Sequence, residues 1–134
     1  MAICLDNTIT VQAGRLTNRY IAMWLFKKPT IDDLKNKAYL VYSEWGPELK
    51  IPREKRLADL FQQIQEDTRI AWIEEFKRID GEIWKVAEEG GPKVYTLESF
   101  RERMNRTFPF MNKAALERAW FLAQYYAWHE GYDK

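Results

Sequence analysis

The chain has 134 residues, of which 46% are hydrophobic and 31% are charged, and its formal net charge is +1. This length suits one domain with its own core, and the composition excludes a disordered protein. The longest uninterrupted apolar run, Ile21 to Phe26, is too short to cross a bilayer, and the single cysteine, Cys4, excludes an internal disulfide.

The N-terminal segment predicts a helix that is apolar over most of its circumference. This helix runs from about Thr10 to Lys28, because Pro29 disfavours helical geometry at the residue before it. We therefore expect an N-terminal helical arm over residues 1–29 and a helical bundle over residues 30–134.

The second predicted helix has clear signals at both ends. Thr30 is placed to cap it with Asp33 at the third helical position, and Gly46-Pro47 ends it. Its apolar face consists of Ile31, Leu34, Ala38, Val41, Tyr42 and Trp45.

The third predicted helix begins near Pro52, and its apolar positions continue to about Glu89. Such a helix is unusually long, and the pair Asp80-Gly81 predicts a break or kink, because glycine costs roughly 1 kcal/mol inside a helix. The sequence leaves open whether the helix continues through this pair. Residues 90–92, Gly-Gly-Pro, are a definite stop.

Two shorter helices complete the chain. Thr96 is placed to cap a helix that runs to about Arg106, and Asn112 is placed to cap a last helix that ends at Gly131. Alternation typical of strands is confined to a few residues around position 94. The sequence thus predicts an all-α fold, a four- to five-helix bundle with an N-terminal helical arm.

No pattern of catalytic or metal-binding residues is present in the sequence. His129 is the only histidine, and neither it nor Cys4 has partners at a spacing typical of a nucleophile and its base. The adjacent pairs Glu74-Glu75 and Glu88-Glu89 diverge by about 100° on a helix, so they do not converge on one metal. We therefore expect no enzyme, no catalytic residue, no metal site and no cofactor.

The small net charge conceals three basic blocks. Residues 1–30, 49–56 and 92–118 each carry +3, whereas residues 57–91 carry −5. Such blocks fit phosphate groups, and arginine adds forked contacts, although a solvated helix face is the alternative interpretation of any single block. The candidate DNA-phosphate-binding residues are Arg15, Arg19, Lys27, Lys28, Lys50, Arg53, Lys55, Arg56, Arg101, Arg103 and Arg106.

Aromatic residues make up 15% of the chain, more than a core of this size requires. They lie on several sides of both the first and the last predicted helix, so each helix needs more than one packing partner. A dense core is one interpretation and a subunit interface is the other. The candidate interface residues are Tyr20, Met23, Trp24, Trp120, Phe121, Tyr125 and Trp128.

This arrangement, a small aromatic-rich helical chain with an arginine-bearing arm, a proline-bounded connection and a bundle, resembles the major capsid proteins of filamentous and rod-shaped archaeal viruses. In that family, subunits of one kind or of two paralogous kinds wrap double-stranded DNA with their N-terminal helices and hold it in the A form. The resemblance implies a virion protein, present in the host cytoplasm during assembly. It also implies phosphate contacts, without reading of the base sequence, by Arg15, Arg19, Lys27, Lys28, Lys50, Arg53, Lys55 and Arg56.

The main prediction is therefore a structural nucleoprotein that coats double-stranded DNA in a helical array, with affinity that falls steeply as salt rises. The alternative is a small helical adaptor or regulatory protein that binds a protein partner through exposed aromatic residues, with little dependence on salt. An enzyme or ligand-binding bundle is a third possibility, and a cofactor bound to the purified protein would indicate it.

Overall fold

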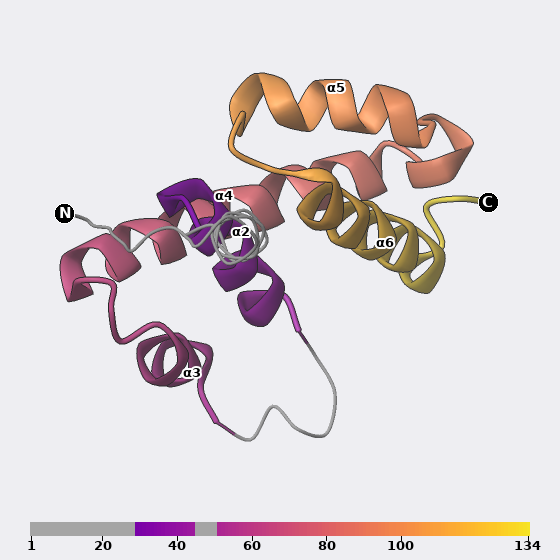
Figure 1. Cartoon of the computed structure of the whole chain (residues 1–134). Helices are drawn as coiled ribbons and strands as arrows, with labels where there is room; N and C mark the ends of the chain where they lie inside the picture. Colours follow the sequence, from indigo (N-terminus) through magenta and orange to yellow (C-terminus); the bar gives the residue numbers. More distant parts are fainter. Residues whose placement is uncertain (1–28, 45–50) are drawn as a thin grey trace, which may run out of the picture. The chain divides into compact units, whose positions relative to one another are not determined.

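The computed structural model describes residues 29–44 and 51–134 (Figure 1). These residues contain α-helices and one short 3-10 turn, and no strand occurs among them, which confirms the all-α prediction. The first predicted helix, over residues 10–28, lies outside the described residues. The elements are α2 Ile31–Tyr42, α3 Arg53–Leu60, α4 Glu66–Glu88, η1 Gly91–Lys93, α5 Leu97–Thr107 and α6 Lys113–Glu130.

The predicted third helix is in fact two helices, α3 and α4. Phe61 leaves helical geometry with φ −124° and ψ 52°, and α4 starts after Gln65, whose backbone is extended. The side chain of Arg69 stabilises the connection between α3 and α4, because its Nη1 atom donates to the carbonyl oxygens of Phe61 and Ile64. The connection therefore needs neither glycine nor proline to satisfy its backbone.

The predicted break at Asp80-Gly81 is wrong, because α4 runs without interruption from Glu66 to Glu88. The local cost of a helical glycine, roughly 1 kcal/mol, is outweighed by burial on both sides of it. The completely buried residues of α4 on either side of the glycine are Phe76, Ile79, Ile83, Val86 and Ala87.

The ends of the last two helices are as predicted. Thr96 and Ser99 form a reciprocal capping box at the start of α5, with N–H···Oγ distances of 3.1 and 3.0 Å. The side-chain oxygen of Asn112 accepts from the N–H of Ala115 at 3.0 Å, and Gly131 ends α6 in the left-handed conformation with φ 78°. The second predicted helix, α2, ends at Tyr42, three residues before its predicted end.

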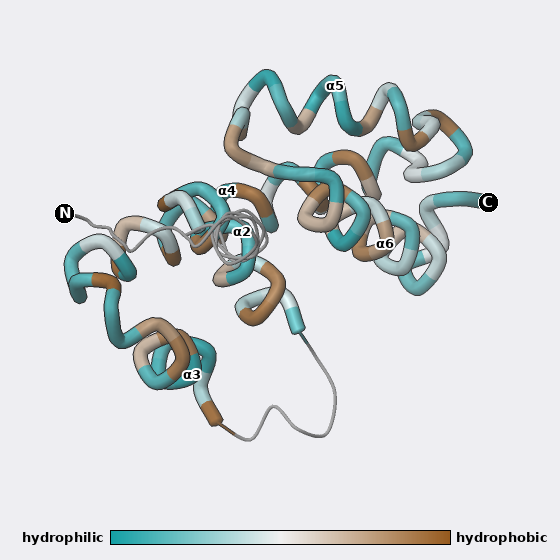
Figure 2. Tube along the Cα trace, viewed as in Figure 1, coloured by the Kyte–Doolittle hydropathy of each residue, from teal (hydrophilic) through white to brown (hydrophobic). Residues whose placement is uncertain are grey.

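The core is built around α4, which packs most extensively on α6 and also on α2 and α3, while α5 packs on α6. The rings of Tyr39 and Phe76 meet edge to face with centroids 5.4 Å apart, which joins α2 to the middle of α4. Figure 2 shows hydrophobic positions recurring at intervals along each helix, as amphipathic packing requires. Among the described residues, none of the helices combines the length and the apolar character that a membrane span requires.

Candidate functional site

The first candidate surface is a series of aromatic rings on the second half of α6. Tyr126 stacks on Trp84 of α4 with centroids 4.4 Å apart and an interplanar angle of 6°. Tyr125 lies 5.8 Å from Tyr126, 6.0 Å from Trp128 and 5.6 Å from the ring of His129. Each such contact contributes about 0.5–1.5 kcal/mol beyond the burial of the rings, so the series is held in a defined arrangement. We call these five residues the aromatic series.

Two large apolar side chains of α6 are exposed: Trp128 at 64% and Phe121 at 50% of their surface. Large exposed apolar groups that cluster on one element mark interaction surfaces. Three of the predicted interface residues, Phe121, Tyr125 and Trp128, belong to this surface. Trp120 does not, because its ring packs on the core, 5.1 Å from the ring of Phe100. Tyr20, Met23 and Trp24 lie outside the described residues.

The aromatic residues face outward because α6 turns small residues toward the core. Gly91, with φ +55°, approaches α6 so closely that a Cβ atom there would lie 2.6 Å from the Cβ of Ala127. Residues four apart share one face of a helix, and at Ala127 the close approach of Gly91 leaves no room for a larger side chain on this face. The buried alanines of α6 are Ala115, Ala119, Ala123 and Ala127.

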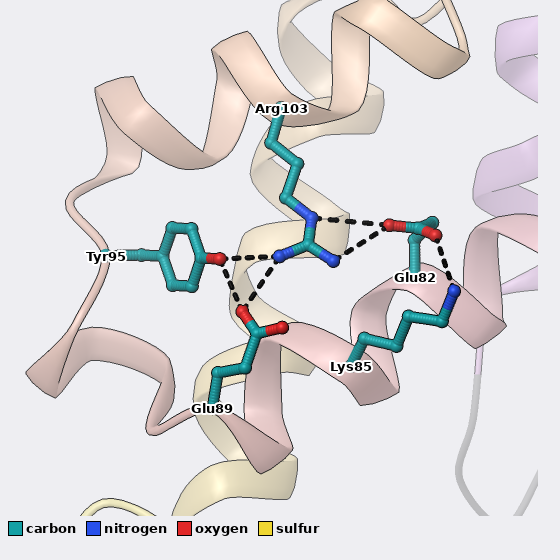
Figure 3. Close-up of polar contacts among 5 residues, drawn as sticks. All are labelled: Glu82, Lys85, Glu89, Tyr95 and Arg103. Carbon is teal, nitrogen blue, oxygen red and sulfur yellow. Dashed lines mark hydrogen bonds and ion pairs between the residues drawn. The ribbon is translucent and has the colours of Figure 1, made fainter.

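The predicted phosphate-binding residue Arg103 is occupied within the bundle (Figure 3). Its guanidinium pairs with Glu82 at 3.1 Å and with Glu89 at 2.9 Å, and it also donates to the hydroxyl of Tyr95. That hydroxyl donates to Glu89, which lowers the pKa of the Glu89 carboxyl and raises the pKa of Tyr95. Arg103 therefore links α5 to the end of α4. Its guanidinium is bound to these protein groups and is not available for a bidentate contact with phosphate.

Two basic residues of α3 are also paired with carboxylates. Arg56 lies 2.6 Å from Glu44, and Lys55 lies 3.4 Å from Asp59 one turn along the helix. The Lys55 pair is exposed, so it contributes little and would yield to a competing phosphate. The Arg56 side chain is mostly buried, so its pair is harder to replace.

The other predicted basic residues are more accessible. Arg101 and Arg106 of α5 are exposed, and neither forms an ion pair within the part of the chain that the structure describes. Arg101 shares a shallow hollow with Glu98 and Glu102, which reduces its attraction for an anion. The residues of α3 and those of α5 do not form one basic face, because these helices lie toward opposite ends of α4 (Figure 1). Arg15, Arg19, Lys27, Lys28 and Lys50 lie outside the described residues.

The second candidate site is a cavity that the sequence did not predict. Its volume is about 250 Å³, and α2, α3, α4 and α6 all contribute to its lining. It contains the carboxylate of Asp80, whose Oδ2 atom accepts from the hydroxyl of Tyr42 at 3.1 Å. Its lining residues are Tyr42, Ser43, Arg53, Asp80, Trp84, Leu122 and Tyr126.

The charges of this cavity are only partly solvated. Burial raises the pKa of the Asp80 carboxyl against the opposing effects of the Tyr42 hydrogen bond and of Arg53. Burial, with the negative charge of Asp80, raises the pKa of Tyr42 to about 12. The signal in the sequence was an aspartate with Phe76, Ile83 and Trp84 as its neighbours three and four positions away on the helix.

Within the described ranges, no three His, Cys, Asp or Glu side chains are placed to hold a metal ion together.

Comparison with known proteins adds no relative. No protein-family model matches the chain, and no curated protein and no solved structure matches it either.

Proposed function

We propose that this protein is a non-enzymatic structural subunit that self-associates through α6 and coats double-stranded DNA without reading its sequence. The observation that carries the proposal is the exposure of Trp128 and Phe121 beside the aromatic series. α6 buries mainly alanine and leaves these two large apolar side chains at the surface, which is typical of an interaction surface. On the architectural resemblance, the assembly would be a viral filament whose DNA is held in the A form.

A second apolar surface supports assembly into an array. Ile51 and Leu60, which line one shallow hollow beside and on α3, are about half exposed, whereas Phe121 and Trp128 are on α6. Contacts between two different surfaces of identical subunits are head-to-tail, and such contacts build open helical filaments when the rotation does not close. One chain of this kind is therefore sufficient for a filament, and a paralogous subunit is an additional option.

The charge distribution supports DNA binding by the N-terminal segment more than by the rest of the chain. Residues 1–30 carry +3 and residues 31–134 carry −2. Arg56 and Arg103 are paired with carboxylates inside the bundle, so we remove them from the residues proposed to bind phosphate. Contact with DNA is then made mainly by the N-terminal residues. The remaining residues are Arg15, Arg19, Lys27, Lys28, Lys50, Arg53 and Lys55, with Arg101 and Arg106 as peripheral contacts.

Negative-stain microscopy of the purified chain with and without double-stranded DNA tests the proposal directly. We expect filaments or long oligomers that incorporate DNA, and binding that weakens steeply between low and physiological salt. Trp128→Ser should reduce self-association, whereas the double variant Arg15→Glu, Arg19→Glu should abolish DNA binding and leave the bundle folded. A monodisperse monomer that does not shift DNA at low salt would refute the proposal.

The second candidate function is an adaptor that binds a protein partner through the same aromatic surface. It is favoured by the internal pairing of Arg103 and Arg56, which leaves fewer cations for phosphate while the surface of α6 stays open. Such an adaptor would remain monomeric alone, and its complex would resist salt. The salt series and the oligomeric state of the free chain therefore separate the two functions.

A further inference from the structure

The cavity beside Asp80 contains two opposite charges, Asp80 and Arg53, that act on each other at a distance and form no direct ion pair. One oxygen of Asp80 accepts from Tyr42, and the other accepts no hydrogen bond from any described residue. The guanidinium of Arg53 lies over the Tyr42 ring, 4.9 Å from its centroid, and forms no ion pair within the described part of the chain. Both side chains line the same cavity, so a carboxylate and a guanidinium face one small space without touching.

The remaining walls of the cavity are aromatic and aliphatic except at Ser43, whose hydroxyl is already hydrogen-bonded to the carbonyl oxygen of Leu40 and to Arg118. Trp84 and Tyr126 are stacked together, so they present one rigid apolar edge, and Leu122 extends it. Trp84 is 38% exposed, which leaves the cavity open on its side. The buried hydroxyl of Tyr39, which interacts electrostatically with Asp80, has no hydrogen-bond partner in the described structure.

These features select among ligand classes. A simple cation would be attracted by Asp80 but repelled by Arg53, and a simple anion would meet the reverse. A neutral ligand would displace water from both charged groups and leave them without a charged partner, which is costly. A ligand that carries an ammonium group and a carboxylate a few ångströms apart would satisfy both.

We propose that this cavity binds a free α-amino acid as its zwitterion. The ammonium group pairs with Asp80, the carboxylate pairs with Arg53, and the side chain rests against Trp84 and Leu122. The volume of about 250 Å³ corresponds to roughly eight water molecules at ~30 Å³ each, which suits a small ligand of this class. The cavity shares Trp84 and Tyr126 with the aromatic series and Arg53 with the proposed phosphate-binding set, but the binding of an amino acid in it requires neither assembly nor DNA.

The test uses the full chain and three matched probes: L-leucine, 3-methylbutylamine, which lacks the carboxylate, and 4-methylpentanoate, which lacks the ammonium group. Titration calorimetry and tryptophan fluorescence measure the binding. We expect saturable binding of leucine, with each single-charge analogue weaker by about tenfold or more, because each lacks one charge-assisted hydrogen-bonded pair.

Two variants test whether Asp80 pairs with the ammonium group of the ligand and Arg53 with its carboxylate. Asp80→Asn should weaken leucine by about tenfold or more and remove its advantage over 4-methylpentanoate, whereas Arg53→Gln should remove its advantage over 3-methylbutylamine. Arg101→Gln, which changes an arginine outside the cavity, should leave leucine binding unchanged. Arg53 is at the first position of α3 and only partly buried, so its variant stays informative even if Asp80→Asn perturbs folding.

Three results would overturn the proposal. The first is no saturable binding of leucine or of the smaller L-alanine. The second is a single-charge analogue that binds as tightly as leucine, which would indicate a simple cation or anion site. The third is leucine binding that survives Arg53→Gln with its preference over the amine intact.

Discussion

Two nitrogen atoms of Arg103, Nε and Nη2, donate to the same carboxylate oxygen of Glu82, at 3.3 and 3.1 Å (Figure 3). The third nitrogen, Nη1, reaches Glu89 at 2.9 Å and the hydroxyl of Tyr95. One side chain of α5 therefore binds the carboxylate of Glu82 in α4, the carboxylate of Glu89 at the C-cap of that helix, and Tyr95 in the connection to α5. Lysine has one charged nitrogen and cannot reproduce this geometry.

Arg103→Lys should lower the free energy of unfolding by about 1–2 kcal/mol, as measured by urea denaturation, because charge-assisted hydrogen bonds of a partly buried fork are lost. The matched control is Lys77→Gln, which removes the pair between Lys77 and Glu74. Both partners there are more than half exposed, so the change should stay within about 0.5 kcal/mol. Equal losses in the two variants would contradict the structural role of Arg103.

Gly81→Ala should stabilise the protein by about 0.5–1 kcal/mol, read as a rise in the midpoint of thermal unfolding. Gly81 lies inside the continuous α4, and an added Cβ atom would have no neighbour within 4 Å, so alanine removes chain entropy from the unfolded state without a clash. Gly131→Ala is the control. Space is also open there, but φ is +78°, so alanine should cost about 1 kcal/mol. A loss at Gly81 would mean that α4 is interrupted at this point.

Local chemistry decided which parts of the fold the sequence could predict. The starts of α5 and α6 and the end of α6 were predictable because Thr96, Asn112 and Gly131 act on their own neighbouring backbone. The break before α4 was not, because Arg69, five residues beyond the buried Ile64, supplies the hydrogen bonds that hold it. The break predicted at Gly81 was wrong because the local free-energy cost of a helical glycine is small compared with the stabilisation from burying the residues around it.

The candidate sites likewise could be predicted only where the signal is local in the sequence. Exposed aromatic residues on α6 were expected from the number of rings on that helix, but Trp120 faces the core and Trp128 does not, and packing decides which. The pairing of Arg103 with Glu82 joins residues 21 apart, and no local pattern indicates it. The cavity depends on four helices meeting, so the sequence showed only one unusual position, Asp80 among apolar neighbours.

Asn36→Leu should destabilise the protein by about 2–4 kcal/mol in urea unfolding. Asn36 is 3% exposed, and its amide donates to the carbonyl oxygens of Asp32 and Phe110 while its oxygen accepts from the N–H of Asn112 at 2.9 Å. Leucine would leave the two distant backbone groups without partners in the interior. Asn105→Ala removes longer bonds, of 3.3 and 3.4 Å, from an exposed residue and should cost less than about 1 kcal/mol. A cost for Asn36→Leu no greater than that of the control would refute this role.

Stability should fall at alkaline pH, in part because of Tyr42. An unfolded tyrosine ionises near its ordinary pKa of 10.0, whereas burial and the charge of Asp80 raise the pKa of folded Tyr42 to about 12. Between these values the native state binds more protons than the unfolded state, so the free energy of unfolding decreases as pH rises. The contribution of Tyr42 is therefore complete below pH 10 and is lost as pH rises through about 12, with a slope of at most about 1.4 kcal/mol per pH unit. Buried Tyr39, whose pKa is also raised by burial, adds to the same slope.

Urea unfolding at intervals from pH 9 to pH 11 measures this slope. Tyr42→Phe should make the decline less steep, because phenylalanine has no proton to lose. Asp80→Asn should reduce it by a smaller amount, since the negative charge is the second cause of the shift and burial, the larger cause, persists. A decline of unchanged steepness in Tyr42→Phe would show that the hydroxyl of Tyr42 ionises equally well in the folded and unfolded chain. In that case the hydroxyl could not be the buried donor to Asp80 that the structure describes.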